Sequence, residues 1–142
     1  MTLDRDIAMN VETDIYNETC SEQLIALLLE IQDMLKKLVD SGEHGYVDLQ
    51  ELNLPARDVQ QLKLVLGTGD VQATVYELGL IQISETGISG VWWVTHKDAS
   101  NEILSDVIEV TTLPEILVTQ HQDLHESVGV LQERLQSLQE KL

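Results

Sequence analysis

Four histidines and one cysteine are the side chains of this chain best suited to metal binding. His121 and His125 are four residues apart in a helical pattern, so they share one helix face. That spacing can supply two ligands to zinc, but a tetrahedral site needs two more. Asp123 and Glu126 do not lie quite on that face. We therefore expect two exposed polar residues and neither a metal nor a cofactor, although a dimer could double the pair.

Cys20 is the single cysteine, so an internal disulfide is impossible, which suits a reducing compartment. Glu18 and Glu22 flank it, and nearby carboxylates disfavour the reactive thiolate. Iron–sulfur clusters are held by several thiolates, which makes a cluster carrier built on Cys20 and the histidines the least favoured reading. We interpret Cys20 as a structural or incidental residue.

Two other features lack the partners that catalysis needs. Glu85 lies in a predicted loop without a second carboxylate or a histidine beside it, so it forms no acid–base pair. The segment 66–70 contains a Gly-x-Gly, but it joins a predicted helix to a strand. A dinucleotide fingerprint joins a strand to a helix. The sequence therefore predicts that this protein is not an enzyme.

Both tryptophans lie in the segment 81–96, in a protein that has no phenylalanine. Two β-rich runs flank a glycine-containing loop there, which predicts a hairpin. Successive strand side chains point to opposite faces of a sheet. Trp92 and Trp93 therefore face opposite sides, and one of them faces a second core, a helix, a partner or water.

Composition limits the classes of partner. The chain has 142 residues, 43% hydrophobic, with a net charge of −17. That length suits one domain, and the charge argues against nucleic acid and anionic membranes as partners. Residues 1–10 resemble no signal peptide, and the apolar run 24–29 is too short to span a bilayer. We expect a cytoplasmic protein whose acidic surface serves solubility or a basic partner.

The N-terminal half is predicted to be helical. Residues 1–17 form an acidic arm without a sustained period, and residues 18–42 form an amphipathic helix opened by Ser21 and closed by Gly42. Residues 43–54 are predicted as a linker with a possible short extended piece at Tyr46 to Leu49. A second helix begins at Pro55 and ends near Leu66.

The period changes to 2 from Asp70 to Thr112, which indicates strands. Short connections favour an antiparallel meander. The fold class predicted is α+β, with a four-stranded, mainly antiparallel sheet packed with helices. The strands are expected at 71–75, 80–84, 91–96 and 103–110.

Pro114 is predicted to open the last helix, and residues 119–142 carry a heptad seam. The seam consists of Leu124, Val128, Leu131, Leu135 and Leu138, with Leu142 continuing the spacing. Such seams pack against another helix. The partner is either the helix at 18–42 or a second chain, and we expect a homodimer.

The order of motifs over residues 52–118 resembles the HupH/HyaF family of hydrogenase expression proteins, as a single domain of the C-terminal type. The motifs are Leu-Gly-Thr-Gly-Asp at 66–70, Ile-Gln-Ile-Ser-Glu-Thr at 81–86, Gly-Val-Trp-Trp-Val at 90–94, Ile-Glu-Val at 108–110 and Leu-Pro-Glu-Ile-Leu at 113–117. With the short connections, they place an α+β domain at residues 43–118. The helix at 18–42 and the heptads lie outside the match.

This resemblance implies a non-enzymatic chaperone of nickel–iron hydrogenase maturation that binds the iron–sulfur small subunit or its precursor, alongside other maturation proteins. Several family members contain two copies of the domain, which a homodimer of this chain would restore. The resemblance assigns the partner-binding surface to Glu85, Thr86, Gly90, Trp92 and Trp93. The alternatives are a scaffolding homodimer built on the heptad seam, and a sheet whose two tryptophans only fill its two faces.

Overall fold

A computed structural model of the protein describes residues 20–142. The acidic arm predicted at residues 1–17 lies outside the described residues. The chain divides into two compact units, one ending at Thr112 and the other spanning Leu113–Leu142. Every strand of the described residues belongs to the first unit.

Helix α2, Glu22–Ser41, lies within the predicted range 18–42 and is capped by the predicted Ser21 and Gly42. Its N-cap is Ser21, whose Oγ accepts a hydrogen bond from the backbone N–H of Leu24 at 3.1 Å. At the other end Gly42 adopts φ 75°, a left-handed conformation that glycine reaches without a Cβ clash. The apolar stripe of α2 faces the core, where Leu24, Leu27 and Ile31 are buried.

Three short elements follow α2. Strand β1 spans Gly45–Asp48, helix α3 spans Leu49–Leu52, and helix α4 spans Ala56–Leu66 with Pro55 as its N-cap. The sequence predicted α4 and a possible extended piece at 46–49, which overlaps β1, but it left α3 within a linker. A four-residue element carries too little periodicity to be recognised, and β1 exists because it pairs with a strand far along the chain.

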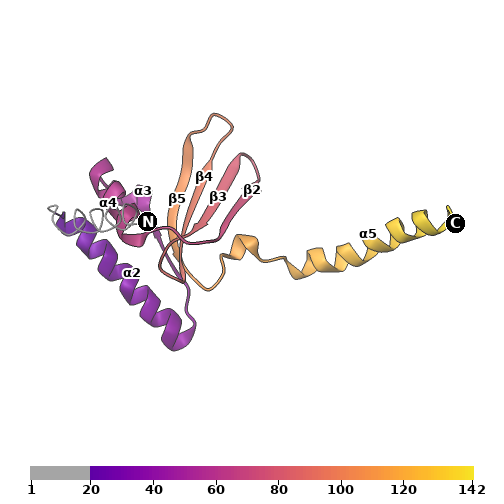
Figure 1. Ribbon diagram of the computed structural model, residues 1–142, viewed down its shortest axis with the longest axis horizontal. Coiled ribbons are helices and arrows are strands. Elements are labelled where there is room, and N and C mark those ends of the chain that lie inside the picture. The colour runs from indigo at the N-terminus through magenta and orange to yellow at the C-terminus, as the bar shows by residue number, and fades with distance from the viewer. Residues whose placement is uncertain (1–19) are drawn as a thin grey trace, which may run out of the picture. The chain divides into compact units, whose positions relative to one another are not determined.

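The sheet has five strands, so the expectation of four was wrong in number although the α+β class and the antiparallel pairing are confirmed. Strands β2, β3, β4 and β5 span Gln72–Tyr76, Leu80–Glu85, Val91–Lys97 and Ile103–Val110. The order is β1-β5-β4-β3-β2, and every neighbouring pair is antiparallel. The meander β2–β5 is extended by β1, which pairs with β5 (Figure 1).

The main core lies between one face of the sheet and helices α2 and α4, and we call this the helix-covered face. Buried leucine and isoleucine side chains of both helices form one cluster with strand residues Val47, Val91, Ile108 and Val110. These strand residues lie on β1, β4 and β5, and α2, α3 and α4 lie on the same side of the sheet (Figure 1). The part of this face that β2 and β3 contribute carries polar side chains instead.

The second unit contains a 3₁₀ helix, η1, at Glu115–Leu117, and helix α5 at His121–Gln139. Pro114 therefore opens η1 and not the last helix as predicted. Val118 leaves η1 with an extended backbone at φ −88° and ψ 123°, which breaks the helical path before α5 begins. All five seam residues of α5 are exposed. Within residues 20–142, no helix is both long and apolar enough to cross a membrane.

Candidate partner-binding surface

Trp92 and Trp93 lie on opposite faces of β4, as the sequence predicted. Trp93 pairs with Ile108 of the helix-covered face, whereas Trp92 pairs with Glu109. Trp92 is only 4% exposed, and its indole N–H donates to the backbone oxygen of Thr111 at 3.1 Å. Trp93 is half-buried against the edge of the main core. Of the two rings, Trp93 is therefore the one that a partner can reach.

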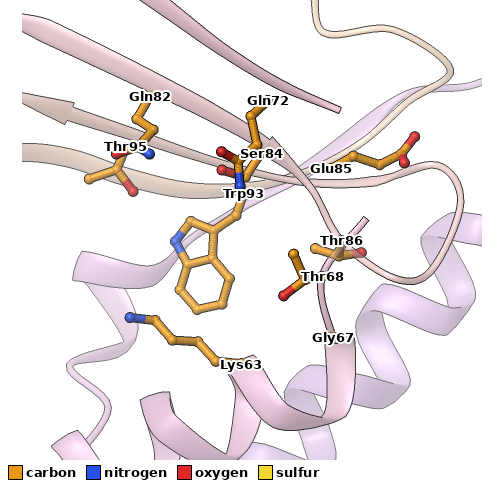
Figure 2. A pocket seen from close by; sticks show the side chains of 10 residues that line it. All are labelled: Lys63, Gly67, Thr68, Gln72, Gln82, Ser84, Glu85, Thr86, Trp93 and Thr95. Atoms are coloured by element: carbon orange, nitrogen blue, oxygen red, sulfur yellow. The ribbon is translucent and has the colours of Figure 1, made fainter. Parts of the chain in front are cut away.

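A pocket of about 310 Å³ opens beside Trp93 (Figure 2), and we call it the Trp93 pocket. Its floor is the polar part of the helix-covered face and its wall is the end of α4 with the turn after it. The lining residues are Lys63, Gly67, Thr68, Gln72, Gln82, Ser84, Glu85, Thr86, Trp93 and Thr95. Hydroxyl, amide and charged groups around one indole provide both hydrogen bonds and an apolar contact, which suits the binding of a ligand or a partner segment.

Two contacts hold the indole of Trp93 in place. Its N–H donates to Asp106 Oδ1 at 2.7 Å, and the same oxygen accepts from Thr95 Oγ1 at 2.9 Å. Lys63 Nζ lies 5.6 Å from the ring centroid, within cation–π range. Figure 2 shows the ring between the sheet and the Lys63 side chain of α4. Trp93 is thus already ordered before binding, so little side-chain entropy would be lost at this residue when a partner binds.

The Leu-Gly-Thr-Gly-Asp segment and the hairpin loop contact each other through their backbones. Gly87 N–H donates to Leu66 oxygen and Gly69 N–H donates to Glu85 oxygen, each at 2.9 Å. A Cβ added at Gly69 would lie 2.5 Å from the backbone oxygen of Thr86. Two of the motifs behind the family resemblance therefore form one structural joint, and residues of both motifs line the Trp93 pocket.

The sequence placed five residues on the binding surface, and the structure brings three of them to the Trp93 pocket: Glu85, Thr86 and Trp93. Thr86 is 4% exposed, and its hydroxyl donates to the oxygen of Val91 at 2.8 Å, which shapes the loop. Gly90 has φ 90° and lies beside Leu35 of α2, outside the pocket. Trp92 also lies outside it.

Sequence reasoning missed Lys63, Asp106 and the polar floor of the pocket. A signal for the floor was present: in β2 and β3 every second residue is polar, at 72, 74, 82 and 84. That alternation marks a polar strip on one sheet face. Lys63 and Asp106 left no signal, because only the fold brings α4 and β5 to Trp93.

The metal-ligand candidates His121, His125 and Cys20 are not among the residues that line this pocket. The rings of His121 and His125 meet edge to face, with centroids 5.0 Å apart. Cys20 is half-buried, with its Sγ 3.8 Å from Gln61 Oε1. Within residues 20–142, no three histidine, cysteine, aspartate or glutamate side chains converge in a group that could hold a metal ion.

Known proteins match this chain in sequence and in fold. A model of the family described as "HupH hydrogenase expression protein, C-terminal conserved region" matches residues 23–138. The Rhodobacter capsulatus hydrogenase expression/formation protein HupH is 30% identical over 113 residues, which are 80% of this chain and 41% of the relative. The Azotobacter vinelandii hydrogenase expression/formation protein HoxQ is 28% identical over 119 residues, 82% of this chain and 40% of the relative.

A solved structure has the same fold. The hydrogenase expression protein HupH from Thiobacillus denitrificans aligns with a TM-score of 0.79 and 32% identity, over 82% of this chain and 98% of that one. This chain spans about two-fifths of the length of the curated relatives. Those relatives are named for hydrogenase expression and formation and not for a reaction that they catalyse. The chain therefore belongs to the HupH hydrogenase expression protein family, whose C-terminal conserved region matches its residues 23–138.

Proposed function

We propose that this chain is a non-enzymatic accessory protein of nickel–iron hydrogenase maturation. It acts as a cytoplasmic chaperone that binds the iron–sulfur small subunit, or its precursor, together with other maturation proteins. The observation that carries the proposal is the family match over residues 23–138.

The binding surface proposed is the Trp93 pocket, with Trp93 as the contacting side chain. Glu85 pairs with Trp92 across the sheet, and its carboxylate points away from the Trp93 ring (Figure 2). Its part is therefore structural, through the backbone oxygen that accepts from the N–H of Gly69. Tryptophan is enriched among the residues that dominate binding energy, and the indole is already oriented by Asp106. Thr86 and Gly90 contribute by shaping the hairpin loop, and Trp92 by holding β4 from the opposite face.

A capture experiment tests the surface. The small subunit is immobilised and binding of the wild-type chain is compared with binding of Trp93→Ala. Loss of a tryptophan hot spot costs ~2 kcal/mol or more, which corresponds to roughly a 30-fold weaker affinity. The matched control is Tyr46→Ala, which removes a 71% exposed aromatic ring from β1, the opposite edge strand. Equal capture of the wild type and of a folded Trp93→Ala variant would reject the surface.

The second candidate function is a scaffolding homodimer formed through α5. The observation that favours it is the exposure of the whole heptad seam, from 49% at Leu135 to 63% at Val128 and Leu138. Burying the leucines of such a seam against a second helix stabilises the paired helices. A dimer would also give two copies of the Trp93 pocket per particle, so the two functions are compatible.

A further inference from the structure

Strand β2 forms one edge of the sheet, and its outer side has no partner strand within residues 20–142. The N–H of Glu85 donates to the oxygen of Val71 at 2.9 Å, which sets the ladder between β3 and β2. Because inward and outward backbone groups alternate along a strand, Ala73 and Val75 bond toward β3. The N–H and C=O groups of Gln72, Thr74 and Tyr76 therefore point away from the sheet.

Within the part of the chain that the structure describes, this edge lacks the features by which sheets avoid pairing with other chains. Edge strands are usually protected by proline, by lysine, by a bulge or by a covering segment. The sequence of β2 is Gln-Ala-Thr-Val-Tyr, without proline or charge, and it pairs with β3 in an unbroken register. Outward donors and acceptors repeating every second residue match one ligand chemistry, the backbone of an extended polypeptide.

Charge at both ends of β2 indicates which polypeptide fits. Asp70 precedes the strand and Glu77 follows it; both are exposed and neither carboxylate has an ion-pair partner within residues 20–142. A second copy paired antiparallel about Thr74 would bring Asp70 of one chain close to Glu77 of the other. Like charges opposite each other destabilise a ladder, and each chain carries a charge of −17. A segment with basic ends fits better.

The turn after β2 adds an apolar contact at one end of the edge. Tyr76 is 83% exposed and Leu78 is 92% exposed. Leu78 also has φ 46°, a left-handed conformation that costs a non-glycine residue roughly 1–2 kcal/mol. Leu78, exposed in this conformation, contributes almost no buried area within the first unit, but its side chain can contact a strand that lies along β2.

We propose that the outer edge of β2 binds an extended, basic segment of a partner polypeptide as a sixth strand, with a lysine or arginine near each end of the segment. This site goes beyond the Trp93 pocket, because its contacts are made by the backbone of Gln72, Thr74 and Tyr76 and by the carboxylates of Asp70 and Glu77. The proposal for the β2 edge does not depend on which hydrogenase protein is the partner.

The test is an NMR titration of the ¹⁵N-labelled full chain with the blocked peptide KTVTVTK, and with ETVTVTE as the control peptide. The amide signals of residues 72, 74 and 76 are expected to shift, and their hydrogen exchange to slow, with the basic peptide only. Thr74→Pro removes one outward N–H without breaking the ladder to β3 and should weaken binding at least tenfold. Thr74→Val keeps the backbone donor and should bind within twofold of the wild type.

A charge-reversed chain, Asp70→Lys with Glu77→Lys, keeps the test decisive if the proline variant does not fold. It should prefer ETVTVTE to KTVTVTK. Trp93→Ala should leave peptide binding unchanged, so the proposal for the β2 edge and the proposal for the Trp93 pocket are tested independently. The proposal is overturned if millimolar KTVTVTK leaves the β2 amides unshifted, if Thr74→Pro binds as the wild type does, or if those amides shift with protein concentration alone, which would assign the edge to a second copy.

Discussion

Asp106 is the residue on which the orientation of Trp93 depends most directly. One carboxylate oxygen accepts from both the Trp93 indole and the Thr95 hydroxyl, at 2.7 and 2.9 Å. Both donors are partly buried, so losing their common acceptor leaves two polar groups unsatisfied. The Trp93 pocket is therefore maintained by a residue that lies outside its lining.

Asp106→Ala is expected to lower the free energy of unfolding by about 1–3 kcal/mol, the usual cost of unsatisfied buried groups. It should also shift the Trp93 fluorescence to longer wavelength as the ring becomes mobile. Asp106→Asn keeps an amide oxygen as acceptor and should lose less than half as much. Urea unfolding followed by tryptophan fluorescence measures both quantities, and equal losses in the two variants would contradict this role.

Gly69 is the residue at which the backbone joint between the α4 turn and the hairpin loop is tightest. An added Cβ would lie 2.5 Å from Thr86 oxygen and 2.6 Å from Glu85 Oε1. Because the first of these is a backbone atom, the loop must move. Gly69→Ala should therefore destabilise the first unit by about 1–3 kcal/mol, the usual cost of overpacking. The midpoint of urea unfolding measures the loss, and an unchanged midpoint would show that the joint adapts.

Elements with long repeats and clear ends were predictable from the sequence. Helix α2 has five apolar residues at spacings of 3 and 4, a serine cap and a terminal glycine, and all three features agree. Strand β1 was predicted only as a possible extended piece at 46–49, because its pairing partner β5 lies far along the chain. Helix α3 was missed because it has only one turn. The Trp93 pocket was predictable in part. The alternation of strand side chains predicted that Trp92 and Trp93 face opposite sides of the sheet, but the contacts of Lys63 and Asp106 with Trp93 arise only from tertiary folding.

Helix α5 is the element whose stability depends least on the packing described for this chain. None of its residues is buried, whereas most of the stability of helices in proteins comes from the packing of an amphipathic face. Gly129 lies in its interior with no atom within 4 Å of an added Cβ. Gly129→Ala should therefore strengthen the helix by about 1 kcal/mol without changing the unfolding midpoint of the first unit.

Circular dichroism at 222 nm tests this expectation at several protein concentrations. The gain in helicity should be largest at low concentration, where an unpaired α5 would fray. A loss of helicity in Gly129→Ala would mean instead that a close helix–helix contact needs the glycine, and would place position 129 within an interface.

At the scale of the whole molecule, a strongly acidic chain carries a helix with an exposed apolar seam. Burying the α5 seam against a second copy is favourable, but bringing together two chains of charge −17 is not. Salt screens the second effect: the Debye length falls from about 30 Å at 0.01 M to about 10 Å at 0.1 M ionic strength. We therefore expect a homodimer whose dissociation constant decreases as salt is added.

Sedimentation equilibrium in 20 mM and 500 mM NaCl measures that dependence. The wild type should approach twice its mass of 15.9 kDa at micromolar concentration in high salt. Leu131→Lys combined with Leu138→Lys places charge in the middle of the seam and should give the monomer mass in both buffers. As a matched control, Leu104→Lys with Leu64→Lys changes two similarly exposed leucines of the first unit and should leave the dimer intact. A wild-type mass of 15.9 kDa at both salt concentrations would mean that the seam serves a different partner, and capture of the hydrogenase small subunit should then require Leu131 and Leu138.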